Sequence, residues 1–184
     1  INISTGADTN TAGFTVPGDL VEAFGDDPGL NSVFDVTAVT GSFAGIAAGS
    51  TIELQATNNI TVSNPFNIAT ATGNSGVNLI LRAGNNINVA ASITTNGAGS
   101  ITLSANDNGG GTASGTGSVT ISSPVSTVNG NININGAAFD NTGGTVNAGT
   151  GNIIINTTSN ITVGSPLSAD AGVSLNAAGT GTIS

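Results

Sequence analysis

The fold is decided by the segment IELQATNNITV at residues 52–62, which returns as LILRAGNNINV at residues 79–89. Each segment opens with two apolar residues separated by one outward position, and a polar residue and a small residue follow. Successive side chains of a strand point to opposite faces, so this order predicts a short strand with one buried face that runs into a tight corner. A second short strand with inward apolar residues follows each corner.

The opening pattern recurs six times, with a mean spacing of about 24 residues. A single copy has too few apolar residues to form an interior, whereas stacked copies bury all of them together. The recurrence of the same offsets in one chain direction predicts parallel pairing between copies. The chain is therefore predicted to be all-β, a parallel β-helix of about six or more coils. The second apolar residue of each copy serves as its anchor: Leu54, Leu81, Leu103, Ile134, Ile155 and Leu175.

Two later positions complete each coil. The inward residue of the second strand is predicted at Val62, Val89, Ile121, Val163 and Ile183, and that of a third strand at Phe66, Ile93, Val125 and Leu167. The third copy carries a Gly-rich insertion over residues 107–117. The fourth copy is irregular, and there Phe139 and Val146 replace the usual pair.

Asparagine recurs at the first corner of the coil, directly before an isoleucine. Asn59, Asn86 and Asn160 share this place, and Ser118 and Thr180 take it in two other copies. Stacked coils would put these residues above one another, which predicts a ladder of side-chain hydrogen bonds. The alternative is that Asn tolerates a left-handed turn conformation at this corner.

Residues 1–50 are predicted to form an irregular N-terminal coil and cap, continuous with repeats over residues 51–184 as one domain. The segment 17–24 is compatible with a short helix, and Asp26-Asp27-Pro28-Gly29 signals a turn. At the other end, Ile183-Ser184 stops partway round a coil. We therefore expect the repeat to continue, or another molecule to cover this end by coil stacking.

The composition removes several functional classes. Asn, Thr, Ser and Gly supply 98 of the 184 residues, Arg82 is the only Lys or Arg, and the net charge is −9. The chain lacks His and Cys, which excludes an imidazole base, a thiol nucleophile and an ordinary zinc site. One basic residue cannot neutralise a phosphate backbone or anionic lipid, so we expect no nucleic-acid binding and no polybasic anchor. No apolar run reaches the length of a membrane-spanning helix.

The acids of the repeat region are the candidates for a catalytic pair. Glycoside hydrolysis needs two carboxylates ~5 to 10 Å apart on one face, but these four have different offsets in their coils, and Arg82 stands alone at an outward position. We interpret them as scattered, solvated acids and expect no catalytic residue, no cofactor and no metal. A polysaccharide-active enzyme stays as a less favoured alternative. The four acids are Glu53, Asp107, Asp140 and Asp170.

Calcium and ice are two further alternatives. Asp26-Asp27-Pro28-Gly29 and Asp107-Asn108-Gly109 place oxygen ligands in turns, but neither belongs to an EF-hand loop or a nonapeptide calcium array, so ordinary turn chemistry is favoured. Ranks of Thr on a flat β-helix face can match an ice lattice. The outward residues before the anchors form no such rank: Glu53, Ile80, Thr102, Asn133, Ile154 and Ser174.

The repeats resemble filamentous haemagglutinin-type exoproteins of cyanobacteria and related Gram-negative bacteria. The similarity covers roughly residues 31–184 and rests on stretches such as 31–39, 52–62, 79–89 and 99–105. It implies a right-handed parallel β-helix exported by two-partner secretion, with an outer-membrane β-barrel transporter as partner. Of the Asn-Pro motifs of the family's secretion domain, only Asn64-Pro65-Phe66-Asn67 is loosely similar. The absence of Cys agrees with export as an unfolded chain.

The resemblance and the neutral polar surface predict a non-catalytic structural and adhesive module on the cell surface of a Gram-negative-type bacterium. Such an adhesin would be a secreted β-helical shaft or extracellular fibre segment that contacts glycans or neighbouring cells weakly at many points. The alternative is a subunit of an extracellular filament or sheath, a homopolymer built by end-to-end stacking of β-helices. Insertion into a membrane is not expected.

Overall fold

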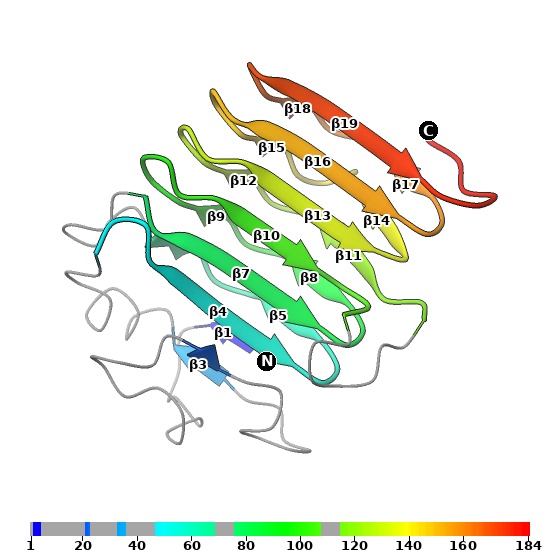
Figure 1. Ribbon diagram of the computed structural model, residues 1–184. Helices are drawn as coiled ribbons and strands as arrows, with labels where there is room; N and C mark the ends of the chain where they lie inside the picture. The colour runs from blue at the N-terminus through cyan, green and yellow to red at the C-terminus, as the bar shows by residue number, and fades with distance from the viewer. Residues whose placement is uncertain (1, 5–20, 23–32, 36–46, 69–75, 108–114) are drawn as a thin grey trace.

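A computed structural model of the chain describes residues 2–4, 21–22, 33–35, 47–68, 76–107 and 115–184 (Figure 1). The predicted turn at 26–29, Asn108-Gly109 and most of the Gly-rich insertion lie outside these residues. The described chain is all-β and folds into three parallel sheets, as the repeat predicts.

The sheets are named in the order in which a coil enters them. The first sheet contains β2 (Val21–Glu22), β4 (Thr51–Ala56), β7 (Asn78–Ala83), β10 (Ile101–Ser104), β13 (Ile132–Gly136), β16 (Asn152–Thr157) and β19 (Gly172–Ala177). The second sheet contains β3 (Val33–Asp35), β1 (Asn2–Ser4), β5 (Ile60–Val62), β8 (Ile87–Val89), β11 (Ser118–Ile121), β14 (Ala138–Asp140) and β17 (Ile161–Thr162). The third contains β6 (Phe66–Asn67), β9 (Ile93–Thr94), β12 (Val125–Ser126), β15 (Val146–Asn147) and β18 (Leu167–Ser168).

The chain winds as a right-handed parallel β-helix. In Figure 1 the first sheet faces the viewer, the chain then crosses behind it through the second and third sheets, and each turn advances toward the C-terminus. Neighbouring strands within a sheet lie ~4.8 Å apart, so the five intervals from β4 to β19 make roughly 24 Å of solenoid.

The interior consists of columns of apolar side chains that follow the axis. Ile52, Leu79, Ile101, Ile132, Ile153 and Val173 pair in register, and the six anchors pair in the same way. The burial of β4 alternates between buried and half-buried residues, as a strand with one inner face requires. The first five members of both columns are completely buried.

Among the described residues, each buried polar side chain has a hydrogen-bond partner. Asn141 is completely buried beside Phe139, at the position that apolar residues take in other coils. Its Nδ2 donates to the carbonyl oxygens of Gly144 (3.1 Å) and Ser165 (2.9 Å), and its Oδ1 accepts from the N–H of Gly164 (3.2 Å). In the irregular fourth coil Phe139 and Val146 are buried in register with Ile161 and Leu167, and Asn141 adds hydrogen bonds where other coils have an apolar residue.

The N-terminal strands extend the first and second sheets. β2 pairs with β4, which contradicts the short helix expected over residues 17–24 at Val21–Glu22. β1 lies between β3 and β5, so the first strand of the chain is inserted inside the second sheet rather than at its edge. The division of the chain at residue 50 stays a prediction.

The last corner differs from the predicted register. Ile183 pairs with Ile161 rather than with Val163, because the corner that follows Leu175 is two residues longer than the corner that follows Ile155. Gly179 has φ +66° in this corner, a conformation that favours glycine. Thr182, and not Thr180, therefore stands in the column of corner asparagines.

Candidate functional site

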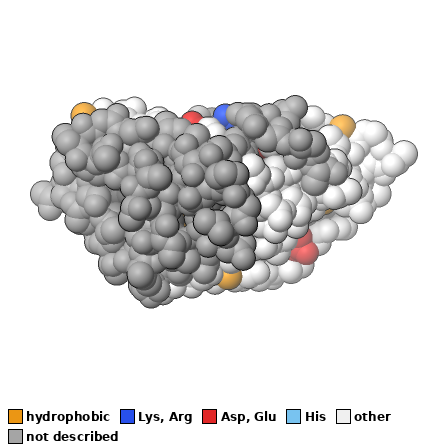
Figure 2. Space-filling model, turned by 90° about the horizontal axis from the view of Figure 1, so that it is seen from below, with side chains coloured by type: hydrophobic (Ala, Val, Ile, Leu, Met, Phe, Trp, Pro, Cys, Tyr) orange, Lys and Arg blue, Asp and Glu red, His pale blue; other side chains and the backbone are white. Residues whose placement is uncertain are grey.

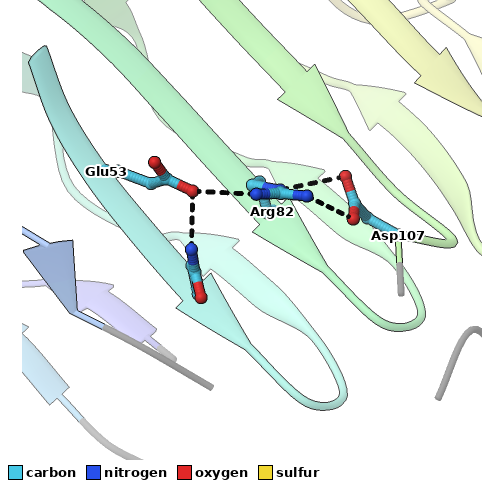
Figure 3. A network of polar contacts seen from close by, with 4 residues as sticks. Glu53, Arg82 and Asp107 are labelled. Atoms are coloured by element: carbon cyan, nitrogen blue, oxygen red, sulfur yellow. Dashed lines mark hydrogen bonds and ion pairs between the residues drawn. The ribbon is translucent and has the colours of Figure 1, made fainter. Parts of the chain in front are cut away.

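The one basic side chain of the protein links three successive coils. Arg82 on β7 donates from Nε and Nη2 to Asp107 Oδ2 and Oδ1, at 3.1 and 2.9 Å, and from Nη1 to Glu53 Oε1 at 3.2 Å. Figure 3 shows the guanidinium between the two carboxylates, with Glu53 on one side and Asp107 on the other. The expectation that Arg82 stands alone, among scattered solvated acids, is wrong for Glu53 and Asp107.

The surroundings strengthen these ion pairs. The exposed fractions of the side chains are 30% for Arg82, 19% for Glu53 and 15% for Asp107. Gln55 Nε2 donates to Glu53 Oε1 at 2.6 Å, which fixes the carboxylate that Arg82 contacts. The bond to Asp107 is the main cause that raises the pKa of Arg82, and Glu53 adds to it against the opposing effect of burial.

The same cluster closes the base of the Gly-rich insertion. Asn106 has φ +57°, and its Oδ1 accepts the N–H of Gly115 at 2.6 Å, which joins the chain before and after residues 108–114. Asp107 follows directly and is held by Arg82. A side chain at Gly117 would meet the carbonyl of Asn85 on the preceding coil, so glycine is required where the insertion returns. Asp107, which the sequence offered as a candidate calcium ligand, therefore forms an ion pair with Arg82.

Two shallow hollows lie on the outer side of the first sheet around Asp107. The smaller, of about 250 Å³, is lined by Glu53, Ile80, Arg82, Thr102, Ser104 and Asp107. The larger, of about 490 Å³, carries amide and hydroxyl groups from four coils: Ser104, Ala105, Asn106, Asp107, Asn135, Gly136, Asn156, Thr157, Thr158, Asn176 and Ala178. Ser104, Asn135, Asn156 and Asn176 pair in register, so these polar groups form a straight row.

Asparagine side chains bond from coil to coil, mostly to backbone N–H groups, and of the predicted side-chain ladder the described residues show the contact between Asn160 Oδ1 and the hydroxyl of Thr182 (3.3 Å). Asn59 Oδ1 accepts the backbone N–H of Asn86 (3.0 Å), Asn86 Oδ1 that of Ser118 (2.9 Å), and Asn160 Oδ1 that of Thr182 (3.0 Å). Among the described residues other than glycine only Asn106 has a positive φ, so the left-handed interpretation of these corners is wrong.

Sequence reasoning missed two further sets of asparagines. Asn78 and Asn131, at the start of the first-sheet strand, accept the N–H of Ser100 and Asn152, each at 2.9 Å. In the row of the larger hollow, Asn156 Nδ2 donates to Asn135 Oδ1 at 3.3 Å. A polar residue follows every anchor in the sequence, and this regularity could have predicted the row.

The remaining acids do not join the cluster. Asp140 lies on β14 in the second sheet, where its Oδ1 accepts the N–H of Thr142 at 2.8 Å, and Asp170 is exposed at the corner before β19. Within the described ranges, no group of three or more His, Cys, Asp or Glu is placed to hold a metal ion. The outward residues before the anchors do form one column, with the mixed composition that argues against an ice-binding rank.

The described surface is polar but nearly uncharged. In the view of Figure 2 it shows only isolated hydrophobic, acidic and basic side chains. Over the part of the chain that the structure describes, no helix is long and apolar enough to cross a membrane.

The class of protein that the fold defines is a right-handed parallel β-helix. Comparison of the chain with protein-family models, with curated proteins and with solved structures finds no match.

Proposed function

We propose that the chain is a non-catalytic structural and adhesive module, a segment of a β-helical shaft on the surface of a Gram-negative-type bacterium. In this proposal the larger hollow and its polar row contact neutral glycans of a neighbouring surface. The resemblance to filamentous haemagglutinin-type exoproteins supports this role, and it adds the two-partner-secretion transporter as an export partner.

The observation that carries the proposal is the row Ser104, Asn135, Asn156 and Asn176. Its amides and hydroxyl repeat at the coil spacing of ~4.8 Å along the open face. A row of donors and acceptors suits a neutral polymer with regularly spaced hydroxyl groups, and many weak contacts add up through avidity. The non-catalytic role is supported by Glu53 and Asp107, since Arg82 occupies both carboxylates.

The test is binding of the purified chain to an array of neutral oligosaccharides, compared between wild type and Asn156→Ala. Asn156 is exposed in the middle of the row, so the substitution removes an amide and leaves the interior intact. Asn88→Ala is the matched control, because Asn88 is also exposed but lies on β8 in the second sheet. We expect binding to weaken in Asn156→Ala alone; equal signals for all three proteins, or no binding to any glycan, contradict the adhesive role.

We propose as a second candidate function a subunit of an extracellular filament or sheath, built by end-to-end stacking of β-helices. Val173 and Ile183 are 44% and 52% exposed, although their partners Ile153 and Ile161 in the preceding coil are completely buried. A further parallel coil, from this chain or from a second copy, would continue these apolar columns along β19. We expect concentration-dependent end-to-end particles by electron microscopy, lost in Val173→Lys. Particles that stay single at high concentration contradict stacking.

A further inference from the structure

The turn between β9 and β10 holds an asparagine and a glycine in an unusual contact. Asn96 is exposed, and its Oδ1 accepts a hydrogen bond of 2.8 Å from the backbone N–H of Gly97, the next residue. Gly97 has φ +59° and lacks a side chain that would hinder its nitrogen. The backbone nitrogen of Gly97 is thereby held beside the side-chain amide of Asn96.

We propose that Asn96-Gly97 is a site of spontaneous self-modification, at which the chain converts Asn96 to a mixture of aspartate and isoaspartate. The nitrogen of Gly97 loses its proton to hydroxide and forms a bond to Cγ of Asn96. The bond from Cγ to Nδ2 breaks, and Nδ2 leaves as ammonia after it takes a proton from water. Water then opens the resulting five-membered imide at either of its two carbonyl carbons, and neither step involves oxidation or reduction.

The fold orients the turn for this reaction. The N–H groups of Gly76 and Gly99 donate to the carbonyl of Asn96 at 2.9 and 3.1 Å, and Asn129 donates to the carbonyl of Gly97 at 2.9 Å. These bonds hold the peptide unit that contains the reacting nitrogen, and they hold it facing the side chain of its own asparagine. Proximity of this kind replaces a search through many conformations.

In the other two described Asn-Gly pairs, the asparagine side chain bonds to a residue of the next coil and not to its own glycine. Asn129 Oδ1 accepts the hydroxyl of Thr150 at 2.9 Å, and Asn135 Oδ1 accepts Nδ2 of Asn156 at 3.3 Å, so both side chains are engaged with the next coil. The carbonyl of Asn135 also accepts the N–H of Ala105 at 2.9 Å. Each of these side chains must first break its bond to the next coil before its Cγ can be attacked. A fourth pair, Asn108-Gly109, lies outside the described residues.

Conversion alters the contact between three coils. The aspartate products add one negative charge at the turn. In isoaspartate the main chain runs through Cβ and Cγ and is one atom longer, and the carbonyl of Asn96 that accepts from Gly76 becomes part of a free carboxylate outside the main chain. Slow conversion of Asn96 therefore alters the hydrogen bonds between neighbouring coils of the solenoid.

The experiment is incubation of the folded chain at mildly alkaline pH, followed by peptide mapping of isoaspartate and of the mass gain of an amide-to-acid conversion. The bond that Asn129 or Asn135 must first break corresponds to about 1 kcal/mol, so Asn96 is expected to convert about fivefold faster than either of them. In denaturant the three pairs should convert at similar rates, and Asn96→Ser should lack the early product while it keeps the circular-dichroism spectrum of the fold. Equal rates in the folded chain, or conversion of Asn129 or Asn135 before Asn96, overturn the proposal.

Discussion

The side chain of Asn59 accepts a 3.0 Å hydrogen bond from the backbone N–H of Asn86, which stands one coil further along the solenoid. Asn86 does the same for Ser118 at 2.9 Å. The strand ladders end at these corners, and the backbone groups there need other partners. Asparagine supplies an acceptor where the sheets cannot.

Removal of this acceptor should weaken the stack. We expect Asn86→Ala to lower the free energy of unfolding by about 1 to 3 kcal/mol, because the N–H of Ser118 loses its partner. Urea denaturation of wild type and variant measures the difference. Asn88→Ala, an exposed change two residues later, serves as the control, and a loss of the same size in both variants would argue against a role for the corner bond.

The Arg82 cluster should make a modest, salt-sensitive contribution. Arg82→Gln is expected to lower the free energy of unfolding by about 1 kcal/mol, since the ions are partly exposed but the pairing with Asp107 is bidentate. High salt should reduce the difference from wild type. Asp170→Asn, which removes an exposed charge outside the cluster, should change stability little. A difference that does not respond to salt would assign the loss to packing of the Arg82 side chain.

The pH dependence of that difference follows from the raised pKa of Arg82. Its charged form is favoured by folding, so its contribution is complete below the pKa of arginine in the unfolded chain. The contribution is lost only as the pH rises through the still higher pKa of the folded state. The gap in melting temperature between wild type and Arg82→Gln should therefore stay constant from neutral to mildly alkaline pH, and a gap that closes in this range would contradict the assignment.

The anchor column offers the same substitution at two depths. Leu103 is completely buried in the third copy, whereas Leu175 in the last copy is only half-buried. We expect Leu103→Ala to cost about 2 to 5 kcal/mol, and Leu175→Ala much less. Chemical denaturation of both variants gives the comparison. Equal losses in a chain shown to be monomeric would mean that the last coil is as well packed as the middle of the solenoid.

A hydrophobic replacement of Asn141 should be unfavourable even though it restores the apolar column. Asn141→Val removes three bonds to the backbone of Gly144, Gly164 and Ser165, and leaves these groups to find other partners. The expected loss is about 1 to 3 kcal/mol of unfolding free energy. Thermal unfolding measures it, and a variant more stable than wild type would show that burial outweighs the bonds at this site.

The coil was predictable because its inward residues repeat. Ile52, Leu79 and Ile101 occupy one column, and their offsets were sufficient to define the strand and its register. The same reasoning misplaced Ile183, since offsets counted from Leu175 do not reveal a corner that is two residues longer. Local propensity suggested a helix at Val21–Glu22, whereas pairing with β4 determines the conformation there.

The site was harder to predict than the fold. Arg82 reaches Glu53 and Asp107 diagonally across neighbouring coils, because its side chain is longer than the spacing between strands. Offsets within a coil describe which face a residue occupies but not which residue of the next coil a long side chain meets. The Asn135–Asn156 contact, between short side chains in one column, follows the repeat more directly.

The parallel ladders place the backbone hydrogen bonds along the axis of the solenoid, and this has a mechanical consequence. A force that pulls the two ends apart along the axis loads the contacts between coils in series, so every contact carries the same force and the weakest one yields first. Each detached coil of about 24 residues releases roughly 80 Å of extended chain in place of a rise of ~4.8 Å. Under tension the rod would lengthen in discrete steps. The work absorbed in each step would lower the peak force on the attachment at either end.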